Sequence, residues 1–155
     1  MKQPSEEFYR LIKLFEGCKL EAYKCSANVI TIGWGSVLDS KGNPIYMGAK
    51  ITQAEADLLL KNEVTRKADF LNKELGKTVI NQNQFDALLS FQYNCGNAAL
   101  SRSSLLRKVK ANPKDISIIA EFARWNKAGG KEIKGLSIRR ATESKLYFTK
   151  YETKI

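Results

Sequence analysis

The most informative residue in this sequence is a carboxylate, Glu16, placed where helix chemistry disfavours one. It closes a segment whose apolar residues recur at helical spacing, and Gly17, a common helix stop, follows directly. A carboxylate in that last turn faces the negative end of the helix dipole, at a cost of about 0.3–1 kcal/mol. Because departures from local rules concentrate at functional sites, and because this position disfavours the ionised form, Glu16 is a candidate general acid. An exposed glutamate that tolerates the cost is the alternative.

Thr31 and Tyr93 are two further candidates for a site. Thr31 lies in a β-branched run at 29–32, just before a Gly-Trp-Gly run at 33–35. Glycines in such a place indicate a close approach of backbone or ligand, although threonine in a strand is also favoured by its β propensity alone. Tyr93 lies near the end of a later apolar segment, where an aromatic side chain serves either the core or a binding surface.

Histidine is absent from the chain, and this restricts the chemistry. Ser-His-Asp triads, Cys-His dyads and His-ligated zinc sites are excluded, so acid–base work must come from Glu, Asp, Lys, Tyr or Cys. The three cysteines, Cys18, Cys25 and Cys95, form no CxxC pair and are odd in number. We therefore expect reduced thiols, with neither a disulfide framework nor a metal site, and no cofactor.

The overall charge is strongly positive. Lys and Arg number 26 against 16 Asp and Glu, which gives +10 in a chain of 155 residues with an ordinary 43% of hydrophobic residues. Nucleic acid, an anionic membrane surface, an acidic polymer, or simply a well-solvated basic surface fits this charge. The basic residues are scattered and accompany no RNA-binding or zinc-finger signature. No apolar run reaches the roughly 18 residues of a membrane span, and the polar N-terminal segment lacks a signal-peptide core, so we expect a cytosolic product.

The elements that must position these residues follow from caps and apolar spacing. The pattern predicts a helix over 5–16 capped by Ser5, a β-containing segment over 19–47 with a strand at 29–32, and a long helix opened by a capping box at 52–55. It then predicts a helix opened by a second capping-box pattern at 81–84 and a short helix from Ser103 or Ser104 to Val109. The last two predicted helices are one with Pro113 in its first turn, which has Ile118, Phe122 and Trp125 on one face, and one over 136–148. A β-containing lobe and a helical lobe joined by a long helix leave a cleft, where ligands commonly bind.

Taken together, these residues resemble the phage-type lysozymes of glycoside hydrolase family 24. The matching pieces, in chain order, are Glu16-Gly17 with Leu20, Tyr23 and Lys24, then Thr31-Ile32-Gly33-Trp34-Gly35, Gln84-Phe85-Asp86-Ala87-Leu88, Tyr93-Asn94-Cys95-Gly96, Ser104-Leu105-Leu106-Arg107, and Gly135-Leu136 with Arg139-Arg140. Each piece alone is short, but together they cover nearly the whole chain.

The resemblance implies a lysozyme-like, mostly helical α+β fold in one domain over 1–155. Its parts would be a small β-containing lobe at 17–51, a connecting helix at 52–75, and a helical lobe at 76–155 with the helix at 5–16 packed on it. The active-site cleft would lie between the lobes.

The family's site transfers onto this chain residue by residue. Glu16 falls on the general acid, and Thr31 falls on the threonine that helps place the attacking water. Cys25 falls on the second catalytic residue, which is Asp in most members. Val37 and Tyr93 fall near positions that line the sugar cleft.

Two positions depart from the family pattern. Ser36 stands where many members carry His, which bears on the packing around the acid. Cys25 bears on mechanism, because glycosidases usually use two carboxylates. A thiolate there, its pKa lowered by the neighbouring Lys24, can act as a nucleophile or can steer water, or the thiol is only structural. Glu21 is a rival second carboxylate, to which the resemblance gives no role.

The function implied is that of a peptidoglycan muramidase, a glycoside hydrolase that cleaves β-1,4 links between N-acetylmuramic acid and N-acetylglucosamine and lyses bacterial cells. We expect a phage or prophage endolysin that is a monomer, binds peptidoglycan but no nucleic acid, and does not insert into membranes. We expect it to stay in the host cytoplasm until a holin breaches the membrane, and then to reach the periplasm and the cell wall. A catalytically silent peptidoglycan-binding protein of the same fold and a basic nucleic-acid-binding protein are the alternatives.

Overall fold

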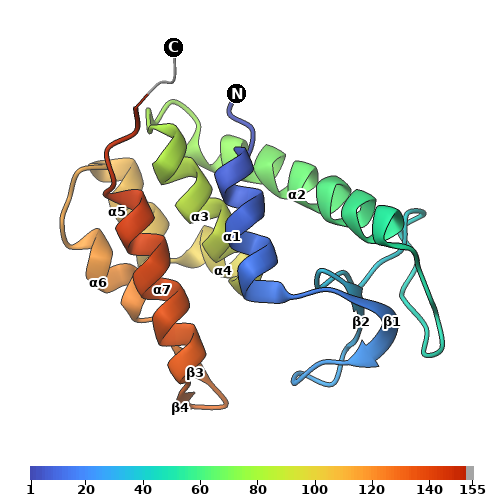
Figure 1. Ribbon diagram of the computed structural model, residues 1–155. Coiled ribbons are helices and arrows are strands. Elements are labelled where there is room, and N and C mark those ends of the chain that lie inside the picture. Colours follow the sequence, from blue (N-terminus) through green and yellow to red (C-terminus); the bar gives the residue numbers. More distant parts are fainter. Residues whose placement is uncertain (153–155) are drawn as a thin grey trace. The chain divides into compact units, whose positions relative to one another are not determined.

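The computed structural model describes residues 1–152 (Figure 1). The chain forms two compact units. One is Tyr9–Arg66, and the other joins Met1–Phe8 to the chain from Lys67 onward. Two helices, α1 (Glu6–Glu16) and α2 (Gln53–Leu75), pass from one unit into the next.

The unit Tyr9–Arg66 contains the predicted β-containing segment. Strands β1 (Lys19–Lys24) and β2 (Ile30–Gly33) pair antiparallel, with Tyr23 opposite Thr31. A small apolar core holds this unit together. It consists of Ala22, Ile32, Ile45, Ala49 and Leu59, with Ile30 and Ile51 packed against it.

The helix boundaries follow the predicted caps. The Ser5 hydroxyl accepts a hydrogen bond from the Phe8 N–H at 3.3 Å, and α1 ends at Gly17, which adopts φ +66°. At the start of α2, the N–H of Glu55 donates to the Thr52 hydroxyl at 3.1 Å and the Glu55 carboxylate accepts from the Thr52 N–H at 3.3 Å. These contacts confirm the predicted cap at Ser5 and the capping box at 52–55.

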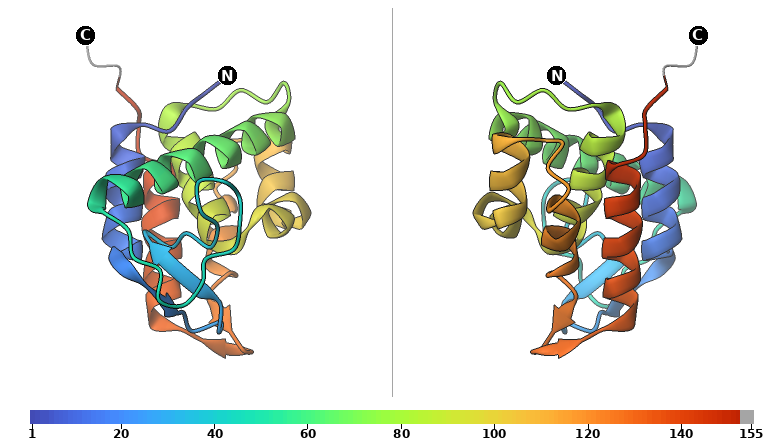
Figure 2. Two further views of the ribbon diagram at one scale, coloured as in Figure 1. Left: turned by 90° about the vertical axis from the view of Figure 1, so that its right-hand side faces the viewer. Right: turned by 90° about the vertical axis from the view of Figure 1, so that its left-hand side faces the viewer.

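The second unit is helical. Its elements beyond α2 are α3 (Gln82–Cys95), α4 (Asn97–Arg102), α5 (Ser104–Ala111), α6 (Ile118–Ala123), the two-residue strands β3 (Lys127–Ala128) and β4 (Lys131–Glu132), and α7 (Lys134–Tyr147). Helices α3 and α7 lie side by side, as both views of Figure 2 show. The core between α3, α6 and α7 is aromatic: Phe91, Phe122 and Tyr147 pack edge to face in sequence, with ring centroids about 6 Å apart.

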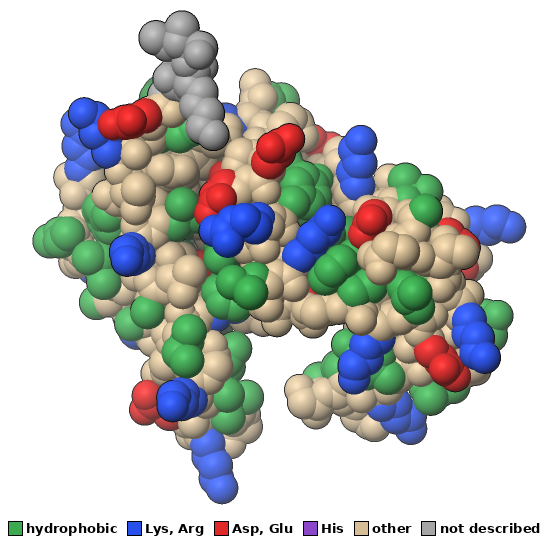
Figure 3. All heavy atoms as spheres, in the orientation of Figure 1, with side chains coloured by type: hydrophobic (Ala, Val, Ile, Leu, Met, Phe, Trp, Pro, Cys, Tyr) green, Lys and Arg blue, Asp and Glu red, His purple; other side chains and the backbone are tan. Residues whose placement is uncertain are grey.

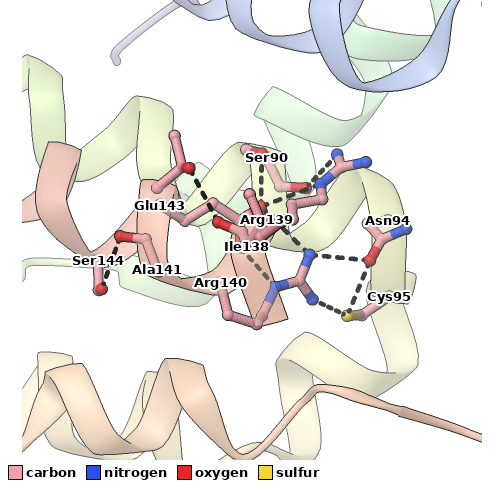
Figure 4. A network of polar contacts seen from close by, with 10 residues as sticks. Ser90, Asn94, Cys95, Ile138, Arg139, Arg140, Ala141, Glu143 and Ser144 are labelled. Carbon is pink, nitrogen blue, oxygen red and sulfur yellow. Dashed lines mark hydrogen bonds and ion pairs between the residues drawn. The ribbon is translucent and has the colours of Figure 1, made fainter. Parts of the chain in front are cut away.

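A buried ionic network also joins α3 to α7 (Figure 4). The Glu143 carboxylate pairs with Arg140 Nε at 2.7 Å and Arg139 Nε at 3.3 Å, and it accepts the Ser90 hydroxyl at 2.5 Å. The side chains of Arg140 and Glu143 are fully buried. Arg140 also contacts Cys95 at the end of α3. This network is structural in kind, because the single Glu143 carboxylate holds two arginine side chains of α7 inside the fold.

Three details differ from the sequence-based prediction. Pro113 does not open a helix, because a turn held by the Asn112 side chain occupies that position and α6 begins only at Ile118. Trp125 lies just beyond α6, although its ring still packs edge-on against Phe91 at 5.3 Å. The short helix α4 and the β3–β4 hairpin were not predicted.

The mostly helical α+β architecture with small antiparallel sheets agrees with the predicted fold class. The division into lobes at 17–51, 52–75 and 76–155 stays a prediction. Within residues 1–152, no helix combines the length and the hydrophobicity needed to cross a membrane. Lys and Arg side chains are dispersed over the face drawn in Figure 3, as the scattered basic residues of the sequence suggested.

Candidate active site

A tight hairpin between β1 and β2 carries the first two candidate residues. Cys25 follows β1 directly, and its N–H donates to the Val29 carbonyl at 2.9 Å. The Asn28 N–H donates back to the Cys25 carbonyl at 2.8 Å, and Asn28 adopts φ +62° to close the turn. Asparagine tolerates this left-handed conformation better than most residues. The hairpin therefore brings Cys25 and Thr31, six residues apart in the chain, to the same end of the sheet.

The environment of Cys25 favours its thiolate. Its pKa is lowered because the backbone N–H of Val29, and then that of Ala27, can donate to the thiolate. The Thr31 hydroxyl contributes in the same direction, while the partial burial of the thiol opposes it. The largest contributions thus come from backbone amides, and not from the Lys24 ammonium to which the sequence pointed. A thiol that ionises more easily than usual is present to a larger extent as the thiolate, the reactive form, at neutral pH.

Thr31 is almost fully buried, with 4% of its surface exposed, and its hydroxyl donates to the Val29 carbonyl at 3.0 Å. The same hydroxyl is within reach of the Cys25 thiol. A hydroxyl has one proton to donate and two lone pairs that accept. When Thr31 donates to the carbonyl, its oxygen can still accept a hydrogen bond from a water molecule beside Cys25. This geometry suits the water-placing role that the resemblance implied.

Glu16 is the last residue of α1 and is half-buried. Tyr23, on β1 opposite Thr31, links it electrostatically to the hairpin. Burial raises the pKa of the Tyr23 phenol, and the negative charges of Cys25 and Glu16 raise it further. The Tyr23 phenol therefore stays neutral and can donate a hydrogen bond. Glu16, Cys25 and Thr31 all belong to the unit Tyr9–Arg66, with Cys25 and Thr31 in one hairpin and Glu16 at the end of α1, three positions before β1 begins.

The predicted sugar-contacting residues lie in different units. Val37 is exposed and lines a cavity of about 60 Å³ together with Leu59 and Arg66 of α2. Tyr93 lies on α3 in the helical unit, half-buried, with the Lys67 ammonium 5.9 Å from its ring centroid. Each is accessible within its own unit, and the substrate-binding role of both stays a prediction.

The two departures from the family pattern have clear structural settings. Ser36 is buried, with 2% of its surface exposed, and its hydroxyl has no hydrogen-bond partner within residues 1–152. A larger polar side chain at this position would have to fill that same buried site. Glu21, the rival carboxylate, is exposed on β1 beside Lys50. All three cysteines are free thiols in the structure.

Sequence reasoning missed the residues that create the environment of the thiol. The amides of Ala27 and Val29 carry no side-chain signature, and only the Asn28 position, typical of tight turns, hints at them. Tyr23 was noticed as part of a motif but was given no role.

The arrangement can perform acid–nucleophile chemistry. Glu16 can supply a proton, the Cys25 thiolate can attack an electrophilic carbon or activate water, and Thr31 can orient that water. Among the described residues, no group of three or more His, Cys, Asp or Glu side chains is arranged to hold a metal ion.

Comparison with known proteins places this geometry in context. The phage lysozyme family matches residues 13–143. The endolysin of Bacillus phage PZA is 42% identical over 147 residues, which is 94% of this chain and 55% of that protein. The chain thus spans about half the length of that relative, and the same holds for the endolysin of Bacillus phage B103.

Two solved structures match over nearly their whole length. An endolysin from Escherichia coli O157:H7 phage FAHEc1 superposes with a TM-score of 0.85 at 34% identity, covering 99% of this chain and 98% of that one. The muramidase domain of SpmX from Asticaccaulis excentricus gives a TM-score of 0.82 at 30% identity, covering 97% and 100%. These structures confirm the lysozyme-like fold. The family match over residues 13–143 and the fold lead to one conclusion: this chain belongs to the phage lysozyme family.

Proposed function

We propose that this chain is a muramidase that hydrolyses the β-1,4 link between N-acetylmuramic acid and N-acetylglucosamine, and that it serves as a phage or prophage endolysin. The observation that carries the proposal is the tight hairpin that holds the Cys25 thiol and the buried Thr31 hydroxyl at one end of the sheet, in the same unit as the carboxyl group of Glu16. Family membership supports it, as does the likeness to structures described as an endolysin and a muramidase domain.

The proposed reaction begins at the glycosidic oxygen. Glu16, in its protonated form, donates its proton to that oxygen while the bond from the oxygen to the anomeric carbon breaks. In the two-step version, the Cys25 thiolate attacks the anomeric carbon and a carbon–sulfur bond forms. A water molecule held by Thr31 then gives a proton to the Glu16 carboxylate and attacks the same carbon, which releases the thiolate. The two displacements retain the anomeric configuration.

In the one-step version, the thiolate of Cys25 only steers or deprotonates the water, and the anomeric configuration inverts. The amide donors of Ala27 and Val29 serve both versions, because they stabilise an anion at this position. An aspartate carboxylate could use the same donors, which is consistent with the residue that most family members carry there.

The experiment that tests the function uses purified sacculi. Incubation with the protein should release soluble muropeptides whose masses and reducing ends identify cleavage after N-acetylmuramic acid. Reducing ends of N-acetylglucosamine would reassign the bond that is cleaved, and the absence of any soluble product would overturn the proposed activity. The anomeric configuration of the fresh products, read by NMR, separates the two versions of the mechanism.

A catalytically silent wall-binding protein is the second candidate, and the replacement of the usual aspartate by Cys25 is the observation that favours it. Such a protein would be retained on sacculi without releasing muropeptides. Binding to duplex DNA in preference to sacculi across a salt series would instead support the nucleic-acid alternative raised by the +10 charge.

The proposal extends to the place of action. We propose that the protein acts on the wall only after the inner membrane is breached, by a holin or by an added solvent. Expression of this chain alone should leave cells intact, and chloroform should then cause rapid lysis. Lysis before any breach would show that another export route operates.

A further inference from the structure

We infer that Trp34 and Asp57 form a clamp that holds the end of α1 and the start of α2 around the strand β2, and that Trp34 is therefore a positioning residue for Glu16. The expected effect of Trp34 on the rate rests on the proposed function. The contacts of the clamp are independent of that function, and all of them lie within the unit Tyr9–Arg66.

The first part of the clamp is the Gly-Trp-Gly turn at 33–35. Reciprocal backbone hydrogen bonds close this turn: the Ile32 N–H donates to the Ser36 carbonyl at 2.9 Å, and the Ser36 N–H donates to the Ile32 carbonyl at 2.8 Å. Thr31 immediately precedes this closed turn on β2. A group that fixes the turn therefore also fixes the end of the strand that carries Thr31.

The second part is the contact between the turn and α2. The indole Nε1 of Trp34 donates to Asp57 Oδ1 at 2.8 Å, and Gln53, one turn earlier on α2, donates to the same oxygen at 3.1 Å. The Trp34 hydrogen bond is the main cause of the lowered pKa of Asp57. Burial opposes it, and Gln53 and the Lys13 charge add smaller contributions that lower the pKa. The carboxylate is thus ionised, and hydrogen bonds to an ionised acceptor are stronger than neutral ones.

Close backbone packing supports the same contact independently. Gly33 has φ +65°, and a Cβ added there would lie 3.3 Å from the Ala56 Cβ. The turn therefore rests directly on the first turn of α2, next to Asp57. Glycine is required at this position both for the left-handed conformation and for the approach.

The third part reaches α1 on both sides of Glu16. The Lys13 ammonium lies 5.4 Å from the Trp34 ring centroid, a cation–π distance, and Lys13 is three residues before Glu16. Gln53, already bound to Asp57, places its amide nitrogen 3.7 Å from the Cys18 sulfur, and Cys18 is two residues after Glu16. The candidate acid Glu16 therefore lies between two contacts of the chain, one at Lys13 and one at Cys18. The first reaches Asp57 through Trp34 and the second reaches it through Gln53.

This arrangement has a kinetic consequence. Proton transfer to a leaving oxygen depends on placement at the ångström level, so a loosened acid lowers the rate of the chemical step more than it weakens substrate binding. Removing the indole N–H should therefore reduce kcat and leave KM nearly unchanged.

The test compares Trp34→Phe with the matched variant Trp125→Phe. Phenylalanine keeps an aromatic face for Lys13 but cannot donate to Asp57. Trp125 is the other tryptophan of the chain, packed edge-on against Phe91 in the helical unit, and has no part in the clamp. We expect Trp34→Phe to lower kcat about 10- to 100-fold with KM within about twofold of the parent, whereas Trp125→Phe keeps the parent kcat.

Variants of the acceptor sharpen the test. Asp57→Asn keeps an oxygen for the indole and should retain most of the activity, whereas Asp57→Leu should match Trp34→Phe. The double variant Trp34→Phe/Asp57→Leu should be no worse than either single change, because both remove the same contact. A parent-like kcat in Trp34→Phe, a change in KM alone, or equal losses in Asp57→Asn and Asp57→Leu would overturn the clamp. Asp57 is exposed, so its variants keep the test available if Trp34→Phe does not fold.

Hydrogen exchange separates failure of the clamp from failure of the proposed function. The Gly17 N–H donates to the Lys13 carbonyl at 3.2 Å and reports the order of the last turn of α1. Its exchange, measured by NMR, should be faster in Trp34→Phe than in the parent and unchanged in Trp125→Phe. If the parent releases no muropeptides but this difference holds, the clamp stands and the proposed function falls. If Gly17 exchanges equally in Trp34→Phe and the parent, the clamp falls, whatever the activity.

Discussion

The hairpin at 25–31 and the contact between α3 and α7 both contain a cysteine beside groups that stabilise its anion, yet the two thiols are driven in opposite directions. Backbone amides of Val29 and Ala27 lower the pKa of Cys25. Burial raises the pKa of Cys95, and the charge of Arg140 only partly offsets this. A few hydrogen-bond donors lower the pKa of the thiol in the turn, whereas desolvation dominates at Cys95, which packs between two helices. In this protein, backbone N–H groups in an exposed turn therefore favour a reactive cysteine more than a neighbouring arginine does.

The carboxylates of the two regions differ in the same way. Glu143 is completely buried between two arginines and serves the packing of α3 on α7. Glu16 is half-buried at the end of α1, in the same unit as the β1–β2 hairpin. The comparison separates ionisable groups that hold the fold from those that are available for chemistry, and four measurements can break or sharpen it.

The largest effect is expected for Glu16→Gln. Glutamine keeps the shape of the side chain but has no acidic proton, so muropeptide release should fall by about 10²- to 10⁴-fold, the usual contribution of general acid catalysis. The midpoint of thermal unfolding should change little. A folded Glu16→Gln protein with near-parent lytic activity would remove Glu16 from the site.

The next effect is on stability and belongs to the helical region. Glu143→Gln leaves two buried arginines without a counter-charge, so the free energy of unfolding should fall by about 3–5 kcal/mol. Glu121→Gln is the matched control, because Glu121 pairs with Lys108 and Arg124, whose side chains are 37% and 68% exposed. That change should cost less than Glu143→Gln, because both cationic partners of Glu121 remain in contact with water. Urea unfolding of both variants decides the matter, and equal losses would contradict the structural role given to Glu143.

Substitution of the two cysteines tests the comparison through activity. Cys25→Ala should lower muropeptide release by about 10²-fold, as loss of a nucleophile or of a base requires. Cys25→Asp, which supplies the usual family residue to the same amides, should remain active. Cys95→Ser should keep the parent rate of the folded protein. If Cys25→Ala equals the parent, the thiol is structural, and Glu16 and Thr31 suffice.

The smallest effect is a difference in alkylation rate, measured by mass spectrometry in a Cys18→Ser background. The thiolate is the reactive form, and the lowered pKa of Cys25 keeps it ionised at pH values where Cys95 is protonated. Near pH 7, Cys25 should therefore react faster than Cys95 by about tenfold or more. The ratio should shrink as the pH rises and Cys95 ionises. A faster reaction at Cys95 would reverse the proposed contrast.

The parts of the fold that were predictable from sequence are those set by local contacts. The side chains of Asn81 and Gln84 cap each other's backbone, with both hydrogen bonds at 2.9 Å, and the sequence pattern at 81–84 already specified this pair. Pro113 misled because two side-chain turns compete with a helix start. Asn112 accepts from the Lys114 N–H, and Asp115 accepts from the Ser117 N–H.

The sequence was enough to propose the candidate side chains, but it did not reveal the hydrogen-bond donors that surround them. Residue type and order pointed to Glu16 and Thr31, and the family resemblance to Cys25. The amide donors around the thiol depend on the path of the backbone, which no residue type encodes. The contact between Trp34 and Asp57 joins residues 23 positions apart, so it appears only once the turn is packed on α2.

The reliance of the hairpin on backbone donors bears on how this segment tolerates genetic variation. The side chains of Ala27 and Val29 are exposed, and the groups that act on the thiol belong to the main chain. Most substitutions at these two positions would leave those groups in place, whereas proline alone removes the N–H. At Asn28 the left-handed backbone admits glycine more readily than a branched residue. This turn can therefore change in sequence, and can carry one anionic residue or another at its start, while the backbone donors that stabilise the charge stay in place.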